Sequence, residues 1–115
     1  MKAFKQYFEN TGLDTSWQAG DVNITLRDVL SLASDPVNVD PSQFEQLLID
    51  VSRDEDRIDG ADLRYPIVVS TRGGKPYKIL DGQHRVVKAI KFNQSVQVQY
   101  LDLDQAPAEY QHIFS

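Results

Sequence analysis

Apolar residues spaced three and four positions apart predict five short helices along this chain. The stripes are Phe4, Tyr7 and Phe8 in residues 2–10, Leu26, Val29, Leu30 and Ala33 in residues 26–33, Phe44, Leu47, Leu48 and Val51 in residues 41–51, Val86, Ala89 and Ile90 after Gly82, and Tyr110, Ile113 and Phe114 after Pro107. This spacing places the apolar side chains of a helix on one face. Each helix is therefore expected to pack through one side only.

Two of these helices have recognisable start signals. The pattern Thr25-x-x-Asp28 matches a capping box, in which two side chains each accept a backbone N–H of the first turn. Before residues 41–51, Asp40 can cap the first amides, Pro41 suits the first helical position and Gln43 closes the box. These signals predict helix starts at Leu26 and Pro41.

Three segments have the composition of strands. The first, "YPIVVS", is apolar at successive positions, as is typical of a strand covered on both faces, and Pro66 places its beginning. The glycines of "TRGGKP" predict a tight connection to a partner strand, "YKIL". The third, "SVQVQYL", predicts a half-exposed strand, with Val96, Val98 and Tyr100 on one face and Gln97 and Gln99 on the other.

Together these elements predict an α+β protein with a small mixed sheet of three or more strands and flanking helices. A chain of 115 residues has the length of a single domain. We divide it into an N-terminal helical extension at 1–34, a core at 35–101 and a C-terminal helical tail at 102–115. The polar run "SRDEDRIDGADLR", at 52–64, is expected to be a loop.

The composition is that of an ordinary soluble protein and excludes several kinds of chemistry. Of the residues, 41% are apolar, and no apolar run approaches the roughly 18 residues that span a bilayer. The first residues lack the pattern of a secretion signal, so we expect a cytoplasmic location. Without cysteine the chain has no disulfide, thiolate metal site or cysteine nucleophile. Asp81, His84 and His112 do not have the spacing of a metal site, and none is predicted.

Charge is distributed unevenly along the chain. Its net charge is −5, but residues 72–91 contain six basic residues and one acidic residue, so this segment is +5 and the rest is −10. The basic residues are Arg72, Lys75, Lys78, Arg85, Lys88 and Lys91. A local basic patch on an acidic protein fits a small anionic ligand, or a confined contact to a phosphate backbone, better than an extended nucleic-acid track. The alternative is a solvated face that carries lysines.

The stretch "YKILDGQHRVVKAI" is predicted to join a strand to a helix through Asp81-Gly82. Glycine adopts backbone angles barred to other residues and lets a ligand approach the main chain. The first amides of the helix, from Gly82, Gln83 and His84, form an anion site, and Arg85 can hold a phosphate or carboxylate in a bidentate fork. His84 can also donate a proton near neutral pH. Two roles stay open for Asp81, which can cap the helix or contact the ligand.

The stretch "YPIVVSTRGGKPYKILDGQHRVVKAI" resembles the ParB/sulfiredoxin-like superfamily, and the resemblance covers about residues 35–101. Members of that family have an apolar "PIvV" strand, a hairpin, and a "DGxHR" or "GERR" corner that opens a helix with a following alanine, here Ala89. The resemblance implies a nucleotide-binding fold that holds the phosphates of ATP, ADP or CTP with Mg²⁺. The phosphate contacts that the resemblance implies are Gly82, Gln83, His84 and Arg85. To these we add Asp81 and Lys88 as candidate nucleotide-binding residues, with Arg72, Lys75 and Lys78 as a supporting basic patch.

Departures from the family pattern favour a binding or regulatory module. Sulfiredoxins need a cysteine at the position of Gln83, and this chain has none. The partition proteins that clamp DNA are less similar, because "SDPVNVDP" stands where a "PxxPR" stretch is expected, and no DNA-reading helix-turn-helix domain is predicted. Direct DNA recognition is therefore not the favoured interpretation.

Three alternatives remain at this stage. A phosphoryl-transfer enzyme resembling the free-serine kinases, whose motif is "DGHHR", would use His84 and Arg85, with Asp35 or Asp40 as the base. A nuclease would need clustered carboxylates for two metals, for which the run Asp54, Glu55, Asp56 and Asp59 is the candidate. A ligand-free interaction factor or homodimer would use the aromatic N-terminal helix and "YQHIF" as contact surfaces.

Overall fold

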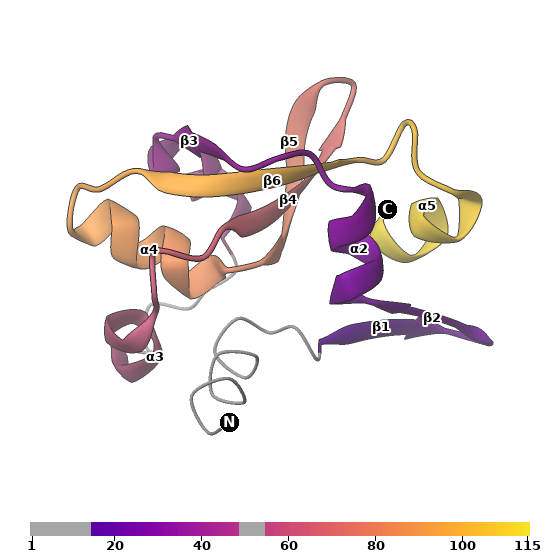
Figure 1. The fold of residues 1–115 in the computed structure, drawn as a ribbon, viewed down its shortest axis with the longest axis horizontal. Helices are drawn as coiled ribbons and strands as arrows, with labels where there is room; N and C mark the ends of the chain where they lie inside the picture. Colours follow the sequence, from indigo (N-terminus) through magenta and orange to yellow (C-terminus); the bar gives the residue numbers. More distant parts are fainter. Residues whose placement is uncertain (1–14, 49–54) are drawn as a thin grey trace.

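The computed structural model describes residues 15–48 and 55–115, which form a four-stranded mixed sheet, a separate two-stranded sheet and short helices (Figure 1). The elements in chain order are β1 (Ser16–Ala19), β2 (Val22–Thr25), α2 (Leu26–Leu32), β3 (Val37–Val39), the 3₁₀-helix η1 (Pro41–Leu47), α3 (Glu55–Gly60), β4 (Ile67–Arg72), β5 (Lys75–Asp81), α4 (Gln83–Lys91), β6 (Val96–Asp102) and α5 (Ala108–Phe114). The predicted α+β class with a mixed sheet is confirmed. The helix predicted at 2–10 lies outside the described residues.

The larger sheet has the strand order β3-β6-β4-β5. β4 and β6 are parallel, whereas the other neighbours are antiparallel. The predicted hairpin from β4 to β5 is confirmed, and its two turn residues, Gly73 and Gly74, have φ values of 57° and 76°. Positive φ at both positions is the requirement of a type I′ turn, which explains the glycine pair. The helix α4 then carries the chain back to β6.

Each face of the larger sheet supports its own apolar core. On one face Ile67 and Val69 of β4 pack with Phe44 of η1 and with Val86 and Ala89 of α4. On the other face Val68 packs with residues of β2, α2, β6 and α5, which include Ile24, Leu26, Val29, Leu101, Tyr110 and Phe114. β4 is therefore buried on both faces, as its apolar run predicted.

Strand β6 lies in the middle of the sheet, between β3 and β4. Its predicted alternation is confirmed, because Val96 and Val98 are buried on the α4 face, together with the partly buried Tyr100. Leu101 is buried on the opposite face, which makes β6 less exposed than expected. Figure 1 shows α3 and α4 near one end of β6, and α2, α5 and the β1–β2 hairpin near the other.

Within residues 15–34, the described part of the predicted N-terminal extension, the predicted helix α2 follows a β-hairpin that the sequence did not indicate. In the described part, β1 and β2 form a hairpin in which Trp17 faces Ile24 in register. Ile24 belongs to the same core cluster as Val68 of β4, and Trp17 makes an edge-on contact with Phe114, with ring centroids 5.0 Å apart. Helix propensity did not reveal this hairpin, because its stability comes from packing on α2 and α5.

The predicted start signals are present. Thr25 Oγ1 accepts the N–H of Asp28 at 3.2 Å, and an oxygen of the Asp28 carboxylate accepts the N–H of Thr25 at 2.9 Å, which completes the capping box. The Asp40 carboxylate accepts the N–H of Ser42 at 2.9 Å, with Pro41 at the start of the helix as predicted. Among the described residues, the Gln43 side chain makes no hydrogen bond that would complete the predicted capping box at Asp40.

The helix after Asp40 differs from the prediction. It is a 3₁₀-helix that ends at Leu47, and Val51 lies outside the described residues. Within it only Pro41 and Phe44 are buried, three positions apart. That spacing matches the three residues per turn of a 3₁₀-helix rather than a broad α-helical stripe. The core contact of Phe44 therefore sets the local geometry.

The acidic run predicted as a loop contains the helix α3. Ile58 is its one buried side chain, with 4% of its surface exposed. Glu55 and Asp56 lie in the first turn, where negative charge interacts favourably with the helix dipole. The short strand β3 was also missed, because three residues give too little alternation to recognise, and its pairing with β6 stabilises it.

The end of α4 positions the loop that leads to β6. Asn93 has a φ of 53°, and the N–H groups of Asn93 and Gln94 donate to the carbonyls of Ile90 and Ala89 at 3.2 and 2.8 Å. This pair of bonds is the Schellman arrangement that ends many helices. The predicted last helix is confirmed as α5, with Tyr110 and Phe114 buried. Within residues 15–48 and 55–115, no helix has the length and apolarity needed to cross a membrane.

Candidate functional site

The Asp-Gly pair is a strand-to-helix corner, as the sequence predicted. β5 ends at Asp81, Gly82 has a φ of 100°, and α4 begins at Gln83. A Cβ atom at position 82 would lie 2.6 Å from Cγ2 of Ile67 and 3.2 Å from its Cα. Both the backbone angle and the contact with β4 therefore require glycine here.

Arg85 points into the protein from the first turn of α4. Only 5% of the residue is exposed, and its Nη2 donates to the Asp81 carboxylate at 2.9 Å. Its Nη1 donates to the backbone carbonyls of Tyr65, at 3.2 Å, and Pro66. The guanidinium thus ties the corner to the segment that enters β4. The bidentate grip on a phosphate that the sequence suggested is not the contact that Arg85 makes in this structure.

Asp81 does not take the capping role, since the N-cap residue of α4 is Gly82 and the Asp81 carboxylate pairs with Arg85. Burial raises the pKa of the Asp81 carboxyl above its ordinary value, while the charge and hydrogen bond of Arg85 oppose that rise. The pair is nearly enclosed, with 16% of the Asp81 side chain and 6% of the Arg85 side chain exposed. Gln83 and His84, which follow the corner, are only partly buried.

Lys88 has a structural contact that the sequence did not indicate. Its Nζ donates to the backbone carbonyls of Asp59 and Ala61, each at 2.7 Å, and so satisfies carbonyls at the end of α3. Lys91, one turn further along α4, lies 3.6 Å from the Asp59 carboxylate in an exposed ion pair. These two lysines of α4 therefore hold α3 and do not face the corner as a patch.

The remaining basic residues of the segment lie on the β4–β5 hairpin. Arg72 and Lys75 flank its tip, and the tip and the corner are at opposite ends of β5, separated by about 20 Å of extended strand (Figure 1). Arg72 and Lys78 both contact the Tyr77 ring, with charge-to-centroid distances of 5.0 and 5.3 Å. The six basic residues therefore do not form the single patch that the sequence suggested.

The two acids considered as catalytic bases lie away from the corner. Asp40 is the cap of η1, and its bond to Ser42 lowers the pKa of its carboxyl. Asp35 precedes β3 and is exposed. Strands β3 and β5 are the two edges of the larger sheet, three strand spacings or about 14 Å apart. Neither acid is therefore placed beside His84 and Arg85.

The nuclease and interaction alternatives also gain no geometric support. Among the described residues, no group of three or more His, Cys, Asp or Glu side chains is arranged to hold a metal ion, and Asp54 lies outside them. Tyr110 and Phe114 of "YQHIF" are core residues and do not form a contact surface. The partly exposed residues at the corner that remain as candidates for ligand contact are Gly82, Gln83 and His84.

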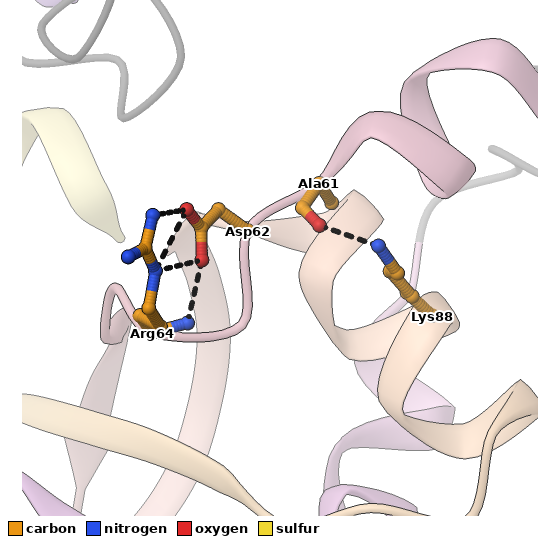
Figure 2. A network of polar contacts seen from close by, with 4 residues as sticks. All are labelled: Ala61, Asp62, Arg64 and Lys88. Carbon is orange, nitrogen blue, oxygen red and sulfur yellow. Dashed lines mark hydrogen bonds and ion pairs between the residues drawn. The ribbon is translucent and has the colours of Figure 1, made fainter.

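Two surface hollows adjoin the second half of α4. One, of about 470 Å³, lies between the β3–η1 connection and the α4–β6 loop, and includes Asn38, Ser42, Asn93 and Ser95. The other, of about 670 Å³, lies between α3 and α4. Part of its lining is drawn in Figure 2, where Lys88 contacts Ala61 and Arg64 contacts Asp62. Neither hollow is lined by residues 81–85, and neither was predicted, because their walls come from segments distant in sequence.

Comparison of the chain with protein-family models, with curated proteins and with solved structures gives no match.

Proposed function

We propose that the corner from Asp81 to Arg85 binds the phosphates of a nucleotide, with Mg²⁺, and that the protein acts as a ParB-like regulatory binding module. One observation carries this proposal. Asp81, the residue best placed to cap α4, is turned toward Arg85, and the N-cap residue of this nine-residue helix is Gly82, which has no side chain to cap it. Phosphate groups bind favourably at such helix ends.

The geometry changes the role that we give to Arg85. Its guanidinium holds the Asp81 carboxylate 2.9 Å away, and this contact keeps a competing anion from the first turn of α4. Arg85 is then a positioning residue. The direct phosphate contacts are assigned to the main chain of Gly82 and Gln83 and to His84, which are only partly buried. This assignment agrees with the resemblance of "DGQHR" to the corner of the family.

A nucleotide fits the charge distribution better than a nucleic-acid strand does. Lys88 and Lys91 contact α3, and Arg72 and Lys75 lie about 20 Å along β5 from the corner. A protein that follows a nucleic-acid backbone uses a continuous basic surface. Binding rather than turnover is proposed, because the Asp81 carboxylate pairs with Arg85 and Asp40 caps η1 at the opposite edge of the sheet.

The test is binding of ATP, ADP and CTP, each with Mg²⁺, measured by calorimetry and thermal shift. Ligand at a hundred times Kd stabilises a folded protein by about 2.7 kcal/mol. Gln83→Glu is the decisive variant, because a carboxylate in the first turn favours the helix dipole but repels a phosphate. We expect a nucleotide affinity at least tenfold lower, and urea unfolding without ligand distinguishes this loss from a loss of folding.

The matched control is Gln105→Glu, which makes the same change at an exposed position after β6. It should bind nucleotide like the unmodified protein. His84→Ala should also weaken binding, since it removes a partly buried side chain next to the corner. If none of the nucleotides binds, or if Gln83→Glu binds as well as Gln105→Glu, phosphate binding at this corner is wrong.

A further inference from the structure

The hollow between α3 and α4 is a wide-open surface groove with the volume of a small-molecule site. Its volume of about 670 Å³ lies within the range of ligand pockets in proteins. It is lined by Asp59, Gly60, Ala61, Asp62, Leu63, Arg64, Lys88, Phe92 and Gln94. These residues come from two segments about 25 positions apart, the end of α3 with the following turn and the second half of α4.

Hydrogen bonds join the two walls of this hollow. Lys88 Nζ donates to the carbonyls of Asp59 and Ala61, each at 2.7 Å, which connects α4 to the end of α3. Within the turn after α3, the exposed Arg64 makes a local fork on the Asp62 carboxylate, with Nη2 at 2.7 Å and Nε at 3.0 and 3.1 Å from its oxygens (Figure 2). Walls that are already in place lower the ordering cost of binding a ligand.

The aromatic ring of Phe92 forms part of the wall and is 52% exposed, more than any other large apolar residue described. Lys91 Nζ lies 5.7 Å from the centroid of this ring. Gln94, two positions further, also lines the hollow, and its side chain makes no hydrogen bond within the described part of the chain. The Schellman bonds of Asn93 and Gln94 hold the backbone here. An exposed aromatic ring and an amide side chain, two positions apart, thus both line the hollow at a turn with hydrogen-bonded backbone.

The charged residues that line the hollow sum to zero, and Lys91 beside it is paired with Asp59. Asp59 and Asp62 are balanced by Lys88 and Arg64, and the Asp62 carboxylate is already paired with Arg64. A phosphate or other strong anion would gain little in such a site. An uncharged ligand gives up the least hydration free energy when it enters such a site. The ring of Phe92 and the amide of Gln94 together match a planar heterocycle, because bases stack on aromatic side chains and asparagine or glutamine amides pair with base edges.

We propose that this hollow binds a flat, uncharged heteroaromatic ring with a hydrogen-bonding edge, of which a nucleobase is the chemical type. The ring stacks on Phe92 and its edge pairs with the Gln94 amide. This site does not depend on phosphate binding at the corner, which is at the other end of α4, about 12 Å along the helix.

The test uses ligands without phosphate, namely adenosine, guanosine, cytidine, uridine and nicotinamide, with binding followed by ligand-observed NMR and by chemical shifts of the protein amides. We expect at least one of them to bind and to shift the amides of residues 92–94. Phe92→Ala should weaken that binding at least about fivefold, as loss of one stacking contact does. Phe92→Leu, which keeps an apolar side chain but no flat ring, should weaken it similarly.

Leu32→Ala is the matched control, since Leu32 is 48% exposed on α2 and does not line the hollow. It should leave the affinity unchanged. Gln94→Ala should change which of the five ligands binds best. The proposal is overturned if none binds at millimolar concentration, or if Phe92→Ala binds as tightly as Leu32→Ala. Loss of binding in Gln83→Glu alone would place the ring compound at the corner and also overturn it.

Discussion

Replacing Arg85 by methionine is predicted to destabilise the fold strongly, in a way that depends on pH. The methionine keeps much of the apolar stem but removes the guanidinium that pairs with Asp81 and with the carbonyls of Tyr65 and Pro66. Removing one partner of a buried ion pair costs about 3–5 kcal/mol, because the other charge stays buried without compensation. The Asp81 side chain keeps 16% exposure, which places the loss near the lower end, about 3 kcal/mol.

The pH dependence of this loss follows from the direction of the Asp81 pKa shift. Burial already raises the pKa of Asp81, and Arg85 is the group that opposes this rise. In Arg85→Met the pKa of the folded protein therefore moves higher, whereas the unfolded value stays near 3.8. A raised folded pKa contributes stability that is complete below the unfolded pKa and disappears as pH rises through the folded one. The variant should thus be closer to the unmodified protein at pH 4.5 than at pH 7.

Urea unfolding measures both effects, with the fluorescence of the single tryptophan, Trp17, as a probe of the core next to Phe114. We expect Arg85→Met to lower the free energy of unfolding by about 3 kcal/mol at pH 7, and Asp81→Asn in the same chain to recover part of this loss. The double variant should have a smaller pH dependence. A loss below about 0.5 kcal/mol, or an equal loss at both pH values, would refute the assignment of the Asp81–Arg85 contact as a buried ion pair.

Three further outcomes follow from the described contacts. Gly82→Ala should cost at least about 2 kcal/mol in urea unfolding, since it combines a left-handed backbone angle with a clash on Ile67, whereas a cost below 1 kcal/mol would mean that the corner relaxes freely. Lys88→Met should speed amide hydrogen exchange in residues 55–60 while β4 and β6 stay protected, and unchanged exchange there would show that the lysine does not hold α3. Hydrogen bonds from Arg64 lower the pKa of the Asp62 carboxyl to about 2. Its contribution to stability should therefore be lost only as pH falls from about 4 through about 2. In NMR the Asp62 carboxyl should titrate near pH 2 in the unmodified protein and closer to 3.8 in Arg64→Met. An unchanged titration in Arg64→Met would contradict that cause.

Local signals in the sequence determined much of the secondary structure. The capping box at Thr25, the Asp40-Pro41 start, the glycine pair of the β4–β5 hairpin and the strand-to-helix corner at Gly82 are all where they were predicted. Each depends on residues a few positions apart, whose backbone angles and hydrogen bonds are decided within one or two turns. Periodicity likewise located β4, β6, α4 and α5, because each buries side chains at the spacing of its own geometry.

The partners of the charged residues were decided only by the tertiary structure. In sequence, Arg85 and Lys88 look like neighbours on one basic helix, but one pairs with Asp81 and the other with the carbonyls that end α3. The strand order puts Asp40 and the corner on opposite edges of the sheet. Side chains find their lowest free energy with partners brought close by long-range packing, and no local pattern encodes which partners those are. The sequence by itself therefore determined the strand-to-helix corner at Gly82, and the tertiary structure decided which charged side chains pair beside it.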